Sequence, residues 1–297
     1  MKKKIVFCLR VILLTFLLFV CMAVSNLLLG AGGETSAPAG AVSALMVYSF
    51  LNALLLSVWI KNSTLHGIRL AAVCFAVFWG VQYFMTQIET LFFNSSVKMP
   101  LSQLYRVVLS GAVYAAVFSL LAVWILGRFR KKNLSEVKPH CAAAKIPELL
   151  PNLAVLALLY VAVYFLFGYF VAWQFPAIRQ FYSGSTQMIG FFQDMAQQSP
   201  SLVLFQVFRG FLWALIALMI RNSLKPNSRL SVIMPGLLFS VLITTPLLFP
   251  NAYMPDPVRF GHSFELFSSM LVFGLLSVPI LKKRHSVTGR GETVPQS

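Results

Sequence analysis

Ionisable side chains inside long apolar stretches are the residues of this sequence that could do chemistry. Glu89, Arg209, His262 and Glu265 each lie among leucine, phenylalanine and valine residues. A charged side chain at the centre of a bilayer costs about 2.5 to 3.5 kcal/mol on insertion scales, so such residues face other helices or a polar cavity. We therefore expect these four side chains to be directed into the interior of the protein.

These residue types suit the binding of a polar solute. An arginine binds a carboxylate or a phosphate through two parallel hydrogen bonds, and a histidine or a carboxylate can carry a coupled proton. Gln82 shares a helical face with Glu89, and Gln206 shares one with Arg209. The predicted substrate-binding residues are Glu89, Arg209, His262, Glu265, Gln82 and Gln206.

Arg209 needs a partner inside the protein. At about 1.5 Å of rise per residue it lies about 13 Å below the start of its apolar run, and Glu265 lies about 10 Å below the start of another. Because an unpaired buried charge is costly, we expect Arg209 to pair with Glu265 or Glu89. An ion pair that merely holds helices together would give the same pattern.

The composition indicates a membrane protein. Of the 297 residues, 58% are hydrophobic and only 11% are charged, whereas a soluble domain carries roughly 25% charged residues. The mean hydropathy is +0.79. We expect an all-α integral membrane protein whose apolar excess contacts the lipid bilayer.

About eight apolar runs are long enough to cross a bilayer, which takes about 20 helical residues. They lie at about 11–30, 41–60, 70–93, 103–127, 150–174, 200–220, 230–249 and 259–281. Pro235 and Pro246 interrupt the seventh run, but neighbouring helices can satisfy the carbonyl groups that a proline frees. The sequence therefore predicts about eight transmembrane helices.

The basic residues predict the orientation. Most of the 24 lysines and arginines precede the first run, follow the eighth, or lie in alternate loops. Because such residues stay on the cytoplasmic side, we expect both termini, including the tail 285–297, in the cytoplasm. The short loops favour a location in the plasma membrane, and specifically in the inner membrane of a prokaryote. Alternatively, the first run is a cleaved signal peptide, which would leave seven spans.

Membrane topology also accounts for the net charge of +16. No basic stretch is interleaved with stacking aromatics on a polar domain, so nucleic acid is not an expected partner. The basic cytoplasmic face is instead expected to meet anionic lipid.

The two halves of the chain resemble each other, which indicates an internal duplication. LLLSVWIKNS at residues 54–63 aligns with ALIALMIRNS at residues 214–223. Because four spans is an even number, both halves enter the membrane in the same direction. We predict two parallel four-helix repeats, 1–130 and 149–284, joined by a cytoplasmic basic linker, 131–148. Some transporters have this arrangement, with the substrate site between the halves.

The loop at 176–200 is predicted to carry a short amphipathic helix. Met188, Ile189, Phe192, Met195 and Ala196 recur at helical spacing. Such a helix would serve as a lid over an outer vestibule or as an interfacial anchor.

No metal site and no cofactor are predicted. The four cysteines show no CxxC spacing, which is typical of free thiols. The chain also contains no HExxH, GxSxG or Walker sequence.

Three functions remain open. The leading hypothesis is a small-solute transporter or permease, for a small-molecule or ion substrate, with a polar site in the outer half of the bundle. The alternative is a non-catalytic membrane scaffold or regulator whose polar residues serve helix packing. The second alternative, less favoured, is an intramembrane enzyme that uses His262 and Glu265.

Overall fold

The computed structural model describes residues 2–30, 40–129, 146–188, 197, 200–226, 228–250 and 253–282, with the backbone alone at 146–148 and 282. Within these ranges the protein is helical and contains no β-strand, only an isolated bridge between Ser63 and Leu224. Three of the cysteines, Cys8, Cys21 and Cys74, are free thiols as predicted, and Cys141 lies outside the described residues.

In the described part of the chain, eight helical segments are long and apolar enough to cross a membrane, which agrees with the predicted number of candidate spans. The candidate spans are α1 (Lys2–Leu29), α2 (Ala41–Asn62), α3 (Gly67–Trp79) continued through η1 (Gly80–Phe84) and α4 (Met85–Phe92), α6 (Leu101–Ile125), α7 (Ile146–Phe170), α10 (Ser201–Asn222), α11 (Arg229–Thr244) continued by η3 (Thr245–Leu248), and α12 (Asp256–Lys282).

The helix bounds differ from the predicted spans mainly at the ends. α1 begins at Lys2, well before the first apolar run, because lysine and arginine are good helix formers that extend a helix beyond its apolar part. Among the residues that the structure describes, three short helices join the spans: α5 (Asn94–Val97), η2 (Ala172–Gln174) and α8 (Pro176–Ser183). α8 was not predicted. The predicted amphipathic helix beyond Met188 lies outside the described residues.

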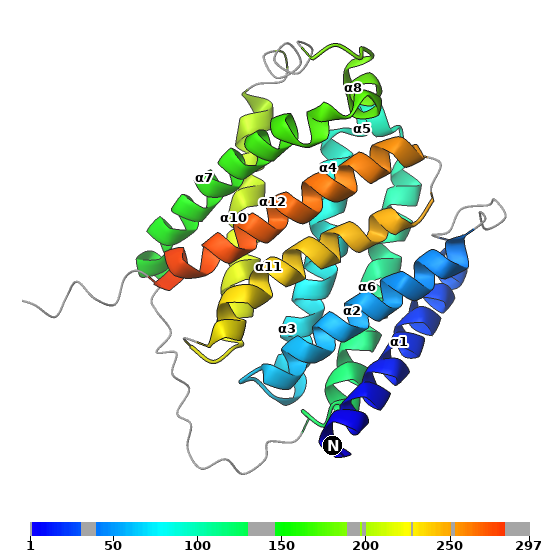
Figure 1. Ribbon diagram of the computed structural model, residues 1–297, viewed down its shortest axis with the longest axis vertical. Coiled ribbons are helices and arrows are strands. Elements are labelled where there is room, and N and C mark those ends of the chain that lie inside the picture. Colours follow the sequence, from blue (N-terminus) through cyan, green and yellow to red (C-terminus); the bar gives the residue numbers. More distant parts are fainter. Residues whose placement is uncertain are drawn as a thin grey trace, which may run out of the picture.

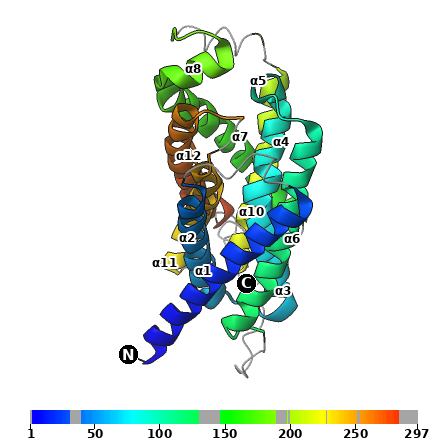
Figure 2. The same cartoon turned by 90° about the vertical axis from the view of Figure 1, so that its right-hand side faces the viewer.

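The spans form two layers (Figures 1 and 2). One layer consists of α12, α11 and α2, and the other consists of α10, the α3–α4 segment and α6. α7 and α1 lie at the two edges, where α1 contacts α2 and α6 while α7 contacts α10 and α12. Each edge helix therefore joins one layer to the other.

The contacts within the first four spans are repeated within the last four. α3 packs on α6 as α11 packs on α12, and between the halves α2 contacts α11 while α3 contacts α10. The halves also meet at corresponding residues of the aligned segments. Ser63 Oγ donates to the Ser223 carbonyl at 2.9 Å, and Trp59 Nε1 donates to Ser223 Oγ at 2.8 Å.

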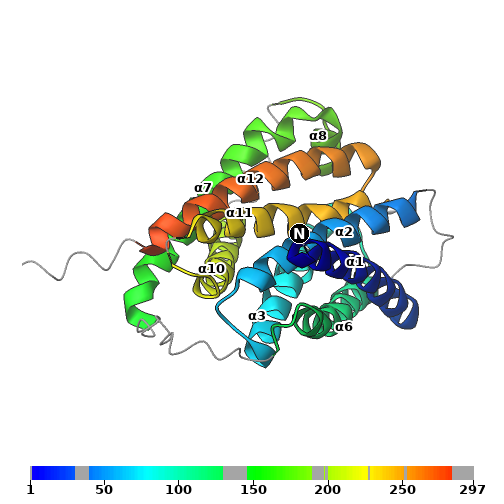
Figure 3. The same ribbon diagram turned by 60° about the horizontal axis from the view of Figure 1, so that its bottom comes forward.

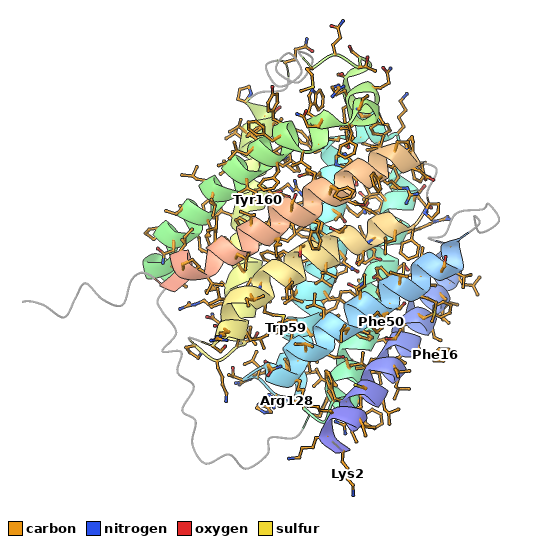
Figure 4. The ribbon with its side chains drawn as sticks, viewed as in Figure 1. Lys2, Phe16, Phe50, Trp59, Arg128 and Tyr160 are labelled. Atoms are coloured by element: carbon orange, nitrogen blue, oxygen red, sulfur yellow. The ribbon has the colours of Figure 1, made fainter. Side chains whose placement is uncertain are left out.

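Basic residues gather at one end of the bundle, called here the basic end. Lys2 and Arg128 lie there in Figure 4, together with Lys61 in the last turn of α2 and Arg221 in the last turn of α10. α4, α5 and α8 lie at the opposite end (Figure 1). The bundle therefore has one strongly basic end.

Small residues bring two pairs of helices close together. A Cβ added to Gly274 of α12 would lie 2.5 Å from Gly236 Cα of α11, and one added to Gly210 of α10 would lie 2.7 Å from Ala157 Cα of α7. Such close backbone approach is typical of helix pairs in membranes, where association depends on van der Waals packing.

Candidate functional site

The centre of the candidate site is an ion pair between the two halves of the chain. Arg209 on α10 donates from Nη1 to Glu89 Oε1 at 2.6 Å and from Nη2 to Glu89 Oε2 at 2.7 Å. The Arg209 side chain is 1% exposed and that of Glu89 is 24% exposed. The prediction that Arg209 pairs with Glu89 or Glu265 is thus confirmed for Glu89.

Further groups hold the Arg209 guanidinium in place. Nη1 donates to Gln206 Oε1 at 3.0 Å, and Nη2 reaches the Met85 carbonyl at 3.3 Å. The rings of Tyr160 and Phe205 lie 5.6 Å and 5.7 Å from the guanidinium carbon, within cation–π range. The guanidinium is therefore fixed by polar groups on α4 and α10 and by two aromatic faces.

Two hydrogen-bond donors at this site are left over. Arg209 Nε and Gln206 Nε2 are both buried, and neither has an acceptor among the described residues. A buried donor without a partner costs about 1 to 3 kcal/mol and calls for an explanation. The site therefore has hydrogen-bonding capacity that the described part of the protein does not use.

Local backbone structure decides where Gln82 points. η1 is a π-helical turn, in which the Met85 amide bonds the Gly80 carbonyl five residues earlier. Such a turn breaks the regular spacing that the sequence implied between Gln82 and Glu89, and π-helical turns occur frequently at functional sites. The Gln82 side chain is hydrogen-bonded to neither Arg209 nor Glu89 and belongs to a second group of polar residues.

This second group, the central polar cluster, lies between the halves. Gln82 Nε2 donates to Asn52 Oδ1 at 3.0 Å and to Thr245 Oγ1 at 3.1 Å. Gln82 Oε1 accepts from Tyr48 at 2.5 Å, and the Tyr48 hydroxyl lies 2.7 Å from that of Tyr114. Tyr114 also donates to Tyr83. All six side chains are buried: Tyr48, Asn52, Gln82, Tyr83, Tyr114 and Thr245.

Of the six residues in the central polar cluster, only Gln82 was predicted from the sequence as a site residue, and the other five were not. Asn52 was the available signal, since it is an uncharged polar residue inside an apolar run. The tyrosines gave no such signal, because tyrosine is common both in cores and at membrane interfaces. The hydrogen-bond partner of a tyrosine hydroxyl is also not visible in a sequence.

His262 and Glu265 lie together on α12 but do not reach Arg209. His262 Nδ1 is 3.5 Å from Glu265 Oε2, and Ser269 Oγ donates to Glu265 Oε1 at 3.4 Å. Both distances are long for hydrogen bonds. His262 Nε2 is buried without a partner among the described residues, so this pair is loosely held.

Tyr182 of α8 is influenced by both carboxylates, those of Glu89 and Glu265. Burial raises the pKa of Tyr182, and the negative charges of Glu89 and then Glu265 raise it further. Its ring lies 5.6 Å from the His262 ring and 6.0 Å from the Phe93 ring. The Tyr182 ring therefore contacts His262 at the end of the bundle opposite the basic end, and its hydroxyl is influenced by the charges of Glu89 and Glu265.

Within the described ranges, no group of three His, Cys, Asp or Glu residues is placed to hold a metal ion.

Arg259, at the start of α12, pairs with Asp256 and donates to the carbonyls of Leu247 and Phe249 at 2.6 and 2.7 Å. It thereby fixes the connection between η3 and α12.

No protein-family model, no curated protein and no solved structure matches the chain. Function is therefore inferred from the residues and their geometry.

Proposed function

We propose that this protein is a small-solute transporter or permease of the plasma membrane, with the basic end and both termini in the cytoplasm. Its substrate would bind at Arg209, Gln206 and Glu89 in the outer half of the bundle, and would pass between two parallel four-span repeats.

The surface of the helices supports a membrane location. Large apolar side chains are exposed along the candidate spans, including Phe16 at 62% and Phe50 at 46% (Figure 4). Leu204 on α10 is 69% exposed. In water such a surface would drive aggregation, whereas lipid solvates it. The basic end faces the cytoplasm because lysine and arginine near span ends remain on that side.

The reciprocal helix contacts support the duplication. A two-fold axis along the membrane normal would exchange α1–α6 with α7–α12, and residues on such an axis meet their own counterparts. Ser63 and Ser223, which correspond in the aligned segments, are hydrogen-bonded to each other. In transporters built in this way, the substrate site lies at the interface between the halves, where the Arg209–Glu89 pair is found.

The observation that carries the proposal is the unused hydrogen-bonding capacity beside this pair. A purely structural ion pair is most stable when every buried donor has an acceptor. Here Arg209 Nε and Gln206 Nε2 have none among the described residues. A solute with carboxylate, phosphate or carbonyl oxygens would supply the acceptors, and the partly exposed Glu89 leaves the pair accessible.

Polar groups continue from this site toward the middle of the bundle. The Thr86 hydroxyl, on α4 between Glu89 and Gln82, donates to the Gln82 carbonyl at 2.6 Å. Gln82 belongs to the central polar cluster, which lies between the halves. In the proposed transporter, a solute moving inward from Arg209 would meet these groups next.

The first test is a thermal-shift screen of the detergent-purified protein against carboxylates, amino acids, phosphates and inorganic ions. A compound that stabilises the protein binds its native state preferentially. The Gln206→Leu variant removes one of the two unused donors and keeps the Arg209–Glu89 pair, and Leu204→Ala on the exposed face of α10 is the control. A stabilising compound should act on the parent and the control and lose its effect in Gln206→Leu.

The second test separates the functions. In proteoliposomes, saturable uptake of the same compound, lost in Gln206→Leu and kept in Leu204→Ala, would support transport. Conversion of the compound to a product would favour an intramembrane enzyme instead. If no compound stabilises the parent and Gln206→Leu melts like the control, the proposal is wrong and the scaffold alternative is preferred, since the paired Arg209 and Glu89 would suffice for it.

A further inference from the structure

A second candidate binding site lies at the basic end, remote from Arg209. A cavity of about 510 Å³ opens where the start of α1 meets the ends of α2 and α6. Figure 3, which brings this end forward, shows α1 between α2 and α6. The cavity is lined by four cations and by apolar side chains, chiefly Lys2, Lys3, Arg10, Lys61, Phe7 and Leu126.

The positive charge of this cavity is not neutralised by the described part of the protein. The acidic side chains that the structure describes are Glu89, Asp256 and Glu265, and they pair with Arg209, Arg259 and His262. Four basic side chains around one cavity repel one another unless an anion is present. The cavity is therefore complementary to a negatively charged ligand.

Two contacts preorganise the cations. Arg10 Nη1 donates to the Leu126 carbonyl at 3.2 Å, and Lys61 Nζ lies 4.1 Å above the centre of the Phe7 ring. The first contact ties α1 to the end of α6, and the second ties α2 to α1. The guanidinium and the ammonium are thus held at the cavity by groups that carry no negative charge.

The apolar part of the cavity continues along the outside of α1. Val6, which lines the cavity, is 46% exposed, and Leu9 and Leu13 farther along α1 are 60% and 51% exposed. A ligand held by its charged part at this cavity would have an apolar helix surface beside it. This combination suits a molecule with an anionic head and hydrocarbon chains better than a free phosphate ion.

We propose that this cavity binds the headgroup of an anionic phospholipid, with the phosphate between Lys2, Arg10 and Lys61 and the acyl chains along α1. Basic pockets between transmembrane helices on the cytoplasmic side are suited to such headgroups. The proposal rests on the membrane location proposed above but does not depend on transport or on the Arg209 site. Lipid binding would fasten α1 against α2 and α6.

The test is titration of the detergent-purified protein with phosphatidylglycerol or phosphatidylcholine, counting bound lipid by native mass spectrometry. The double variant Lys3→Gln with Lys61→Gln removes two cations from the cavity. The matched control, Lys225→Gln with Arg229→Gln, removes two exposed cations, one in the loop after α10 and one at the first residue of α11. Inorganic phosphate is added as a competitor in a separate arm.

The parent and the control should bind phosphatidylglycerol in preference to phosphatidylcholine. The cavity variant should need about 30-fold more phosphatidylglycerol for half-saturation, because each basic residue near an anionic surface contributes roughly fivefold. Equal loss in both double variants would overturn the proposal in favour of diffuse attraction. Displacement by millimolar phosphate would also overturn it and indicate a soluble-anion site. If the variant is not recovered, Lys2→Gln with Lys3→Gln replaces it.

Discussion

Arg209 and Glu89 are 120 positions apart in the sequence, yet they are joined by two hydrogen bonds of 2.6 and 2.7 Å. Arg209 belongs to the last four candidate spans and Glu89 to the first four. Their pairing therefore fixes α10 against α4 and makes the interface between the halves polar at this depth. The following predictions test this interface and the packing around it.

Replacing Arg209 by alanine should destabilise the protein strongly. The change leaves the Glu89 carboxylate without its partner, and breaking a buried ion pair typically costs about 3 to 5 kcal/mol. The free energy of unfolding, measured in mixed micelles with increasing denaturing detergent, should fall by this amount. Leu204→Ala, at a side chain 69% exposed on the same helix, is the control and should cost much less. Equal losses in the two variants would contradict a strong pair.

The two carboxylates first considered as partners of Arg209 should respond differently to neutralisation. Glu89→Gln keeps the shape of the side chain but removes the charge that the buried guanidinium needs. Glu265→Gln disturbs two long contacts, with His262 at 3.5 Å and with Ser269 at 3.4 Å. We expect Glu89→Gln to lower the thermal midpoint more than Glu265→Gln does. The reverse order would show that Glu265 is the functional partner of Arg209.

Closely packed helix backbones should make Gly274 intolerant of a side chain. A Cβ there would lie 2.5 Å from Gly236 Cα, so α11 and α12 would have to separate. Overpacking of this kind costs typically about 1 to 3 kcal/mol. Gly168→Ala on α7 is the control, because a Cβ there meets nothing within 4 Å. The control should be neutral or slightly stabilised, since alanine favours helix over glycine, and thermal melts of both variants measure the difference.

Ser63 and Leu224 are paired in an isolated β-bridge. We therefore expect cysteines introduced at these two positions to form a disulfide between the halves. Paired residues of this kind have Cα atoms about 4.5 to 5.5 Å apart, within the range for a disulfide. In a variant lacking the four native cysteines, Ser63→Cys with Leu224→Cys should oxidise readily. A protease site placed in the linker 131–148 provides the readout: after cleavage, the two fragments should remain joined until a reductant is added.

The control for this experiment pairs Leu54→Cys with Leu224→Cys. Leu54 lies more than two helical turns from the end of α2, so this pair should give separate fragments. Cross-linking of the control as efficient as that of the bridge pair would indicate that the halves are not held in the arrangement described.

The sequence alone determined the number of candidate spans and the basic end. Both are local properties: a membrane-length helix requires a continuous apolar run, and each such run is bounded by its own polar residues. The need of Arg209 for a carboxylate also followed from the sequence, because burying an unpaired guanidinium is expensive wherever it occurs.

Tertiary structure decided which partner Arg209 has and which polar residues come together. Glu89 and Glu265 were both candidates from the sequence, and only the packing of α10 against α4 distinguishes them. The π-helical turn at Gly80–Phe84 separated Gln82 from Glu89, although regular helical spacing had placed them on one face. Tyr48 and Asn52 of α2, Tyr114 of α6 and Thr245 of η3 come from three segments distant in the sequence. Their hydrogen bonds to Gln82 exist only because the folded helices bring them within reach.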